Sequence, residues 1–368
     1  MKIAILTLPL HTNYGGILQA YALQTILERM GNDVHVIEKK RKPLSLPIYK
    51  MPFSYGKRII KNLIGRRFPL FYEQKINRER PIIQQYTDEF IHKYIHLKQY
   101  DTFSGILPSE YDAFVVGSDQ VWRPKYFGAN QMGNAYLQFT ESWDVKRLAY
   151  AASFGTENWE YTPKQTEECS RLAKLFNAIS VREDSGIELC KKYLGVDARH
   201  VLDPTMLLGK QDYINLFEAA HTPKSKGNLL YYILDETEEK KGILKSIVDE
   251  KKLNPFNVKS NSDDISSPIS ERIQPPLEQW LRGFYDADFI FTDSFHACVF
   301  SILFNKPFIV YGNKNRGMSR FVSLLTMFGL EDTLVTSSKS LSDVDFDWQK
   351  VNLTLSQKRK EAHSFLRF

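Results

Sequence analysis

The chain has 368 residues, of which 43% are hydrophobic and 25% charged, and its formal net charge is +6. This length accommodates two domains with separate cores, and the composition excludes a disordered or fibrous protein. No apolar run approaches the roughly 18 residues that a membrane-spanning helix needs. The opening "MKIAILTLPLHTNYGG" lacks a small-residue cleavage signal, which favours a buried first strand over a signal peptide.

The cysteines and the charge distribution restrict the class of protein further. Cys169, Cys190 and Cys298 are odd in number and widely spaced, which indicates neither a disulfide framework nor a zinc site and is typical of a reducing cytoplasm. Residues 39–80 contain thirteen Lys and Arg against two Glu, a net charge of +11, so the remainder of the chain carries −5. Because the basicity is local, we expect no nucleic-acid partner.

The N-terminal half alternates short apolar runs with helical patterns. Such runs are typical of buried parallel strands, and the alternation predicts βαβ units. Strands are expected at 2–8, 33–38, 111–119, 147–155, 178–183 and 198–204, a turn at "NYGG" (13–16), and a helix at 17–30.

A polar stretch at 218–228 reads as a hinge, after which the same alternation resumes. Strands are expected at 229–235, 288–293 and 307–312, with helices at 236–252, 277–287, 295–304 and 319–329. The fold class is therefore predicted as α/β, with two Rossmann-like, doubly wound parallel-sheet domains facing a cleft. The predicted boundaries are 1–217 with a basic insertion at about 39–80, 229–346, and a C-terminal helix at 347–368 that packs back.

Ligands of open α/β sheets bind beyond the carboxyl ends of the strands, and several polar clusters occupy that place. After the first strand, Asn13, Gly15 and Gly16 could let backbone N–H groups bind an anion, although a tight turn without a ligand fits equally well. The GxGxxG spacing of a dinucleotide site is missing.

A second cluster follows the strand at 111–119. Ser118, Asp119 and Gln120 offer a hydroxyl, a carboxylate and an amide, which suit the hydroxyls of a sugar acceptor. A well-capped loop is the alternative. Arg182 follows the strand at 178–183, where its guanidinium could bind a carboxylate or phosphate, and a structural ion pair is its alternative.

The stretch "TDSFHACVF" (292–300) places His296 just past a strand and in the first turn of a helix. An imidazole exchanges protons near neutral pH, so His296 is a candidate catalytic residue, with Asp293 and Ser294 beside it. A core histidine satisfied by hydrogen bonds is the alternative. Further basic residues, which are either solvated or bind a phosphate, follow the next strand: Lys314, Arg316 and Arg320.

These stretches in this order resemble the polysaccharide pyruvyltransferase family. The resemblance rests on "NYGGILQAYALQTIL", "VVGSDQVW", "YAASFG", "SVREDSG", "VLDPTML" and "TDSFHACVFSILFNKPFIVY". It implies a GT-B-like fold and an enzyme that transfers pyruvate from phosphoenolpyruvate (PEP) to two hydroxyls of a sugar, forming a ketal and releasing phosphate, in surface polysaccharide biosynthesis. It implies PEP as co-substrate, and the sequence offers no metal-ligand cluster and requires no other cofactor.

The resemblance also assigns roles to particular residues. His296 matches the essential histidine of the family and Arg182 an anion-binding arginine, whereas Lys314, Arg316 and Arg320 match donor-binding residues more loosely. Ser294 stands where some members of the family have an arginine, so PEP as the donor is an expectation. A GT-B-like glycosyltransferase that uses a nucleotide sugar and a non-catalytic carbohydrate-binding relative remain as alternatives.

Within the basic segment, residues 54–71 combine isoleucine and leucine with lysine and arginine. This is the pattern of a basic amphipathic helix that lies on an anionic membrane surface. A surface helix packed by its apolar face is the alternative. The predicted location is accordingly cytoplasmic, with peripheral contact at the inner face of the membrane, and the sequence leaves open whether the sugar acceptor is lipid-linked.

Overall fold

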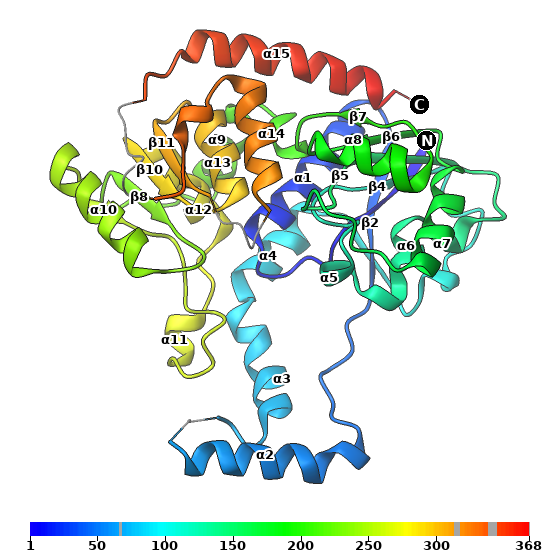
Figure 1. The fold of residues 1–368 in the computed structure, drawn as a ribbon, viewed down its shortest axis with the longest axis horizontal. Coiled ribbons are helices and arrows are strands. Elements are labelled where there is room, and N and C mark those ends of the chain that lie inside the picture. Colours follow the sequence, from blue (N-terminus) through cyan, green and yellow to red (C-terminus); the bar gives the residue numbers. More distant parts are fainter. Residues whose placement is uncertain (66–67, 313–316, 338–343, 368) are drawn as a thin grey trace.

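The computed structural model describes residues 1–65, 68–312, 317–337 and 344–367. In these residues the chain forms two parallel sheets, each in its own domain, and the two domains lie side by side (Figure 1). This confirms the predicted fold class of two Rossmann-like α/β domains facing each other in a GT-B-like arrangement. No helix among the described residues is long and apolar enough to span a bilayer.

The N-terminal sheet has seven strands within the described chain, in the order β3-β2-β1-β4-β5-β6-β7. The central strand β1 pairs in parallel with β2 and β4, so that Ile5 lies opposite both Val36 and Val115. All three side chains are buried, as expected for strands covered on both faces. The strands are β1 Lys2–Leu6, β2 Asp33–Lys39, β3 Leu97–Tyr100, β4 Ala113–Val116, β5 Lys146–Ala152, β6 Ala178–Val181 and β7 Arg199–His200.

Helices connect these strands, and a long excursion leaves the sheet after β2. The helices are α1 Tyr14–Arg29, α2 Met51–Leu63, α3 Tyr72–Ile83, α4 Gln85–Tyr94, α5 Pro124–Phe127, α6 Met132–Ala135, α7 Pro163–Ala173 and α8 Ser185–Leu189. The helix α1 begins at Tyr14 rather than at 17, so "NYGG" is the first turn of a helix and not a separate turn.

The C-terminal sheet has the strand order β12-β11-β10-β8-β9 among the described residues. Its strands are β8 Leu229–Tyr232, β9 Pro255–Phe256, β10 Phe289–Thr292, β11 Phe308–Tyr311 and β12 Leu334–Val335. Its helices are α10 Glu238–Lys251, α11 Ile269–Arg272, α12 Leu277–Asp286, α13 Phe295–Leu303 and α14 Met318–Phe328.

Two helices link the domains. The helix α9 (Lys210–Ala219) packs on the C-terminal domain through the ring pairs Tyr213–Phe300, at 4.9 Å, and Phe217–Tyr285, at 5.4 Å. It also contacts the first domain, since Asp212 of α9 accepts from Arg29 of α1 at 2.6 Å, so α9 bridges the two domains near the boundary predicted at 217. The helix α15 (Trp348–Phe365) then runs back across both domains (Figure 1).

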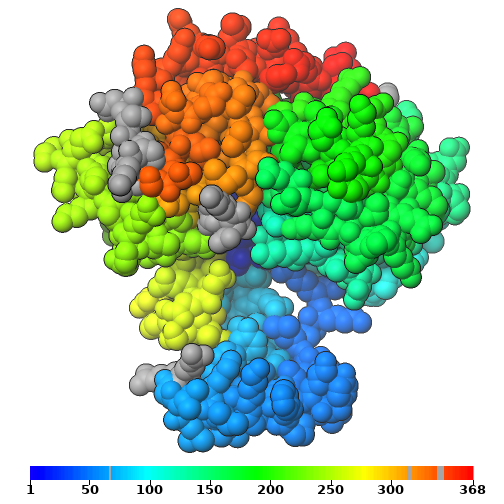
Figure 2. Space-filling model, in the orientation of Figure 1, coloured from blue at the N-terminus to red at the C-terminus, as the bar shows by residue number. Residues whose placement is uncertain are grey.

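The basic segment is part of an arm that extends from the first domain. The sequence predicted only one of its helices, at 54–71. The helices α3 and α4 form a stalk, and α2 lies across its far end, away from both sheets (Figure 1). The space-filling view shows the arm standing clear of the body (Figure 2). Residues 72–94 showed no clear apolar periodicity, and Pro81 inside α3 further obscured the helical pattern.

Candidate active site

A cavity of about 580 Å³ lies between the two domains, at the carboxyl ends of their strands. Each sheet reverses its strand order there, between β1 and β4 in the first and between β8 and β10 in the second. Such switch points are where open α/β sheets bind ligands. The cavity is lined from the first domain by Asn13, Asp119 and Gln120, and from the second by Asp293, Ser294, His296 and Arg320.

The local structure of α13 positions His296. The backbone N–H of Ser294 donates to Thr292 Oγ1 at 3.0 Å, which holds the turn between β10 and α13. Ser294 is the N-cap of α13, and its hydroxyl accepts from the N–H of Ala297 at 3.5 Å. These contacts place His296 in the first helical turn, with 9% of its side chain exposed, on the cavity wall. Ser294, predicted to bind the donor, therefore caps this helix and also lines the cavity.

The imidazole of His296 rests directly against the first turn of α1 in the other domain. A Cβ placed on Gly15 would lie 2.0 Å from Nδ1 and 2.1 Å from Cγ of His296. Only glycine permits this approach, because real Cβ atoms do not come within 3.0 Å of another heavy atom. Gly15 was expected to let a ligand approach the backbone. In the structure, the imidazole of His296 from the second domain occupies this space. Gly16 packs instead against the side chain of Asn13.

A buried carboxylate of the first domain faces the same imidazole. Nε2 of His296 lies 3.6 Å from Oδ2 of Asp203, an ion-pair distance longer than a hydrogen bond. Asp203 follows β7 and is held by Thr205, whose N–H and hydroxyl donate to Oδ1 at 3.0 Å and 2.6 Å. Burial alone would raise the pKa of Asp203, but His296 and Arg182 hold it well below its ordinary value.

Arg182 is the centre of an ion-pair network and does not line the cavity. Its guanidinium donates to Asp203 at 2.9 Å and to Asp119 at 3.1 Å, and only 1% of its side chain is exposed. Burial would lower the pKa of Arg182, but the two carboxylates raise it above its ordinary value. The structure thus gives Arg182 the structural ion pair that the sequence left as the alternative, because its two terminal nitrogens donate to these carboxylates.

Asp293 is likewise committed to the protein. Its carboxylate accepts from the N–H groups of Leu234 and Asp235 at 2.6 Å and 3.1 Å, and from the ammonium of Lys240 at 2.7 Å. None of its side chain is exposed. Asp293 therefore braces the loop after β8 at the switch point, and the carboxylate that faces His296 is Asp203.

The three residues predicted to bind the acceptor separate into two groups. Ser118 is fully buried, and its hydroxyl donates to the carbonyl of Ala151 at 3.0 Å, so the prediction for this side chain was wrong. Asp119 and Gln120 do line the cavity. Burial would raise the pKa of Asp119, but Arg182 lowers it, and Asn13 donates to its Oδ2 at 3.3 Å.

Two cationic side chains line the cavity within the described part of the chain. Arg320 of α14 packs its guanidinium over the ring of Phe295 at 5.3 Å, and burial lowers its pKa to about 10, which leaves it charged at neutral pH. Lys259 donates to the carbonyls of Ile233 and Leu234 at 2.9 Å and 3.1 Å. Lys314 and Arg316 lie outside the described residues.

Sequence reasoning missed Lys259 and Asp203. Lys259 stands in a polar loop without a distinctive pattern, so no local signal marked it. Asp203 had a signal, because "HVLDP" places an acid shortly after an apolar run, as Asp119 and Asp293 are placed after theirs.

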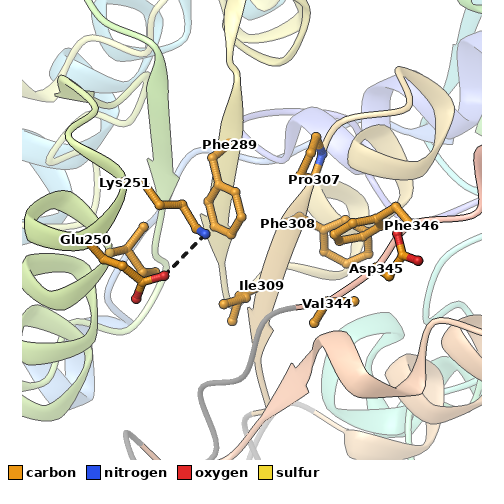
Figure 3. A pocket seen from close by; sticks show the side chains of 10 residues that line it. Glu250, Lys251, Phe289, Pro307, Phe308, Ile309, Val344, Asp345 and Phe346 are labelled. Carbon is orange, nitrogen blue, oxygen red and sulfur yellow. Dashed lines mark ion pairs between the residues drawn. The ribbon is translucent and has the colours of Figure 1, made fainter.

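A second cavity, of about 660 Å³, lies at the opposite end of the C-terminal sheet, between α10 and the start of β10 and β11. Figure 3 shows the rings of Phe289, Phe308 and Phe346 along it, and a single ion pair between Glu250 and Lys251 at 3.5 Å. Because it lies away from the carboxyl ends of the strands and from His296, we do not assign the chemistry to it.

Comparisons with known proteins place this geometry in context. The family model described as polysaccharide pyruvyl transferase matches residues 13–315, most of the chain. No curated protein matches the chain in sequence. Solved structures with a similar chain trace include the UDP-GlcNAc 2-epimerase from Neisseria meningitidis bound to UDP-GlcNAc, with 10% identity and a TM-score of 0.49, covering 98% of this chain and 94% of that one.

Two further structures show the same level of likeness. The UDP-GlcNAc 2-epimerase from Methanocaldococcus jannaschii has 12% identity and a TM-score of 0.47, covering 97% of this chain and 92% of that one. UGT89C1 from Arabidopsis thaliana, complexed with UDP-L-rhamnose, has 8% identity and a TM-score of 0.45, covering 100% of this chain and 95% of that one.

Proposed function

The chain belongs to the polysaccharide pyruvyl transferase family, and from this premise we propose that it transfers the pyruvyl group of PEP to two hydroxyls of a sugar, forming a ketal. The observation that carries the proposal is the position of His296, which lies on the wall of the polar cavity while it packs against Gly15 and faces the buried Asp203 of the other domain. A merely structural histidine has no need of a carboxylate from the other domain and of an opening toward solvent.

The donor would bind on the Arg320 side of the cavity. PEP carries a carboxylate and a phosphate, which require cationic partners. Arg320 supplies one described guanidinium on the cavity wall, and its position against Phe295 fixes the plane of that guanidinium.

The acceptor would bind on the opposite wall. There the cavity is lined by the loop 259–264, with Asn261, Ser262, Asp263 and Asp264, and by Gln274. Hydroxyl, amide and carboxylate groups of this kind match the hydrogen-bonding groups of a sugar. Asp119 and Gln120, predicted from the sequence to bind the acceptor, line the same cavity from the first domain.

The proposed reaction is balanced in atoms and charge. A proton adds to the methylene carbon of PEP, and the resulting cationic centre at C2 is captured by the first sugar hydroxyl. The C–O bond to phosphate then breaks with its electron pair, phosphate leaves, and the second hydroxyl closes the ketal. The two sugar hydroxyls together release two protons. One of them balances the proton that the methylene carbon gained, and the other leaves with phosphate.

His296 would act as the general acid and base in this sequence. It can take the proton of the incoming hydroxyl and give a proton to the departing phosphate, a contribution of about 10²–10⁴ in rate. Asp203 would stabilise the imidazolium form while that proton is held, and Arg182 would keep Asp203 ionised. Asp203 and Arg182 are thus positioning residues, since neither is expected to touch the substrate.

Phosphate release from PEP, measured against a panel of hexosides, tests this function. Release that depends on both PEP and a sugar, with a pyruvyl ketal found by mass spectrometry, is the expected result. A parallel arm measures thermal stabilisation by PEP and by UDP- and GDP-sugars. Stabilisation by a nucleotide sugar and not by PEP would replace the proposal with a glycosyltransferase. Sugar binding without any phosphate release would indicate a carbohydrate-binding relative.

A further inference from the structure

The helix α2, at the far end of the arm, exposes large apolar side chains on one face. Phe53 is 78% exposed, Ile60 61%, Leu63 81% and Ile64 67%. Their spacing of three, four and seven residues puts all four on one side of the helix. The turn that precedes the helix is also exposed, with Ile48 at 83%. Monomeric globular proteins rarely expose an apolar stripe of this kind without a partner for it.

The polar face of α2, in contrast, is turned toward the protein. Arg58 is buried and donates to Glu73 of α3 at 2.9 Å and 2.5 Å, and to the carbonyl of Leu70 at 2.7 Å. Its guanidinium also packs near the rings of Tyr55 and Tyr72. An ordinary surface helix is oriented the other way, with its apolar face inward. The alternative left by the sequence, a helix packed by its apolar face, is therefore wrong.

Basic side chains flank the exposed apolar face. Lys57 and Lys61 lie on the helix between and beside the four apolar residues, and Lys50 immediately precedes it. The whole segment 39–80 carries a net charge of +11 after its two acidic residues, Glu73 and Glu79, are counted. A face that is apolar at its centre and cationic at its margin is complementary to the surface of an anionic lipid bilayer.

We propose that the α2 face formed by Phe53, Ile60, Leu63 and Ile64 docks on an anionic lipid bilayer, with the flanking lysines at the level of the headgroups. A second copy of the chain is a poorer occupant, because a symmetric pairing of this face would bring two such cationic segments together. The arm's polar contacts hold α2 across the end of the stalk (Figure 1), an orientation that lets the helix lie flat on a surface.

The arm connects this face to the cavity, and at this point the inference rests on the proposed function. α3 is fastened to the loop that lines the acceptor side: Lys75 donates to the carbonyl of Ile265 at 3.0 Å, and Arg272 to Glu79 at 2.6 Å. Gln274, on the cavity wall, donates its N–H to the carbonyl of Ile83 at the last residue of α3.

The length of α3 sets the separation between the exposed face of α2 and the acceptor wall of the cavity. α2 is fastened at Glu73 and the cavity wall at Ile83. Ten residues of α-helix separate these points, a rise of about 15 Å. With α2 on the bilayer, this rise holds the acceptor wall clear of the lipid surface, and from this separation we infer that the acceptor is a glycan carried on a lipid.

Co-sedimentation with vesicles tests the docking surface without reference to catalysis. The full chain is mixed at low salt with phosphatidylcholine vesicles that contain about 30% phosphatidylglycerol, and with phosphatidylcholine alone. We expect sedimentation with the anionic vesicles only, and release at high salt. The triple variant Phe53→Ser, Ile60→Ser, Leu63→Ser should bind the anionic vesicles at least about tenfold more weakly than the wild type does. The double variant Lys57→Glu, Lys61→Glu should show the same loss.

A matched control uses three apolar residues exposed elsewhere, Leu107→Ser, Leu175→Ser and Leu353→Ser, which should leave vesicle binding and the thermal midpoint unchanged. No sedimentation of the wild type with anionic vesicles overturns the proposal. A wild-type dimer that the α2 variant dissociates, without vesicle binding, overturns it in favour of a second copy. His296→Gln should still bind vesicles, so a failure of PEP turnover alone would count only against the enzymatic proposal.

Discussion

Gly15 and His296, separated by most of the chain, pack so closely that position 15 has no room for a methyl group. The first turn of α1 and the first turn of α13 meet at this contact, one from each domain. The placement of the imidazole in the cavity therefore depends on a glycine that carries no functional group of its own.

Gly15→Ala is expected to reduce PEP-dependent phosphate release by about 100-fold or more, because a small displacement of a catalytic group is that costly. The added methyl would lie 2.0 Å from the ring, so either the imidazole rotates or the domain contact opens. Overpacking of this kind costs about 1–3 kcal/mol, which leaves a folded protein. Steady-state kinetics and urea unfolding measure the two effects.

The control for this substitution is Gly242→Ala. Gly242 lies inside α10, and a Cβ there meets nothing within 4 Å. Because alanine is the better helix former, this variant should gain about 1 kcal/mol of stability and keep full activity. Equal turnover of Gly15→Ala and wild type would show that the contact with His296 has no bearing on catalysis.

His296→Gln is expected to lower phosphate release from PEP by about 10²–10⁴-fold while the fold survives. Glutamine fills a similar volume but cannot exchange a proton at neutral pH. Single-turnover measurements separate this loss of chemistry from a loss of donor binding. His92→Gln, at an exposed position on α4, serves as the matched control and should behave as wild type. Near wild-type turnover of His296→Gln would refute the role proposed for the imidazole.

Arg182→Met is expected to act on stability first. It leaves the buried carboxylates of Asp119 and Asp203 without their guanidinium, and breaking a buried ion pair in this way costs about 3–5 kcal/mol. Both pKa values are lowered in the folded state, so the stability that the pair contributes is present above their ordinary pKa of 3.8 and is lost as the pH falls. Urea unfolding at pH 7 and at about pH 3, below that ordinary pKa, should therefore show a difference in the free energy of unfolding between variant and wild type that narrows in acid.

Arg182→Lys separates the structural role from donor binding. One ammonium keeps the charge but cannot reach both carboxylates as the planar guanidinium does. The folded variant should have a lower kcat, because Asp203 is no longer held in place against His296. Its KM for PEP should stay close to that of the wild type. A stable variant with a KM raised tenfold or more and an unchanged kcat would restore the anion-binding role implied by the family resemblance.

How far the sequence predicts this protein depends on the range of the interactions concerned. Nine of the twelve described strands were predictable because runs such as "KIAIL" and "FIFT" are apolar and short. The short strands β3, β9 and β12, all near the edges of the sheets, were not predicted. The position of His296 at a strand end was predictable for the same local reason. The fold class and the approximate place of the cavity therefore required no coordinates.

The pairing of side chains was not predictable, because it depends on packing between distant segments. Asp293, next to His296 in sequence, accepts hydrogen bonds from the loop after β8, whereas Asp203, far away in sequence, faces the imidazole. Arg182 and Ser118 are buried for similar reasons, since the neighbouring strands supply their partners. For α2 the sequence showed an amphipathic pattern but could not show which face points outward.

Arg320→Gln is expected to weaken PEP binding. A hydrogen bond to a charged group contributes about 1.5–3 kcal/mol, so the Kd for PEP should rise roughly ten- to a hundredfold. Arg320 remains charged at neutral pH, because burial lowers its pKa only to about 10. Titration calorimetry with PEP measures the change. Arg199→Gln, on the exposed start of β7, removes the same charge elsewhere and should not alter the Kd. An unchanged Kd for Arg320→Gln would place the donor on another part of the wall.

The last prediction concerns His11, which lines the cavity beside Thr12. Burial, together with the charges of Arg41 and Arg80, lowers the pKa of His11 to about 4. The unfolded chain binds this proton near pH 6.5, so between about pH 6.5 and pH 4 the unfolded state holds more protons and stability falls as the pH falls. The loss approaches 1.4 kcal/mol per pH unit at most.

His11→Asn removes this titration. Urea unfolding at pH 7 and pH 5 should show that the variant loses less stability on acidification than the wild type does. His221→Asn, at an exposed position whose left-handed backbone asparagine tolerates, should follow the wild type. The same loss in His11→Asn and wild type would mean that His11 takes up its proton in the folded state. That outcome would make it a third cation on the described cavity wall, beside Arg320 and Lys259, available to an anionic donor.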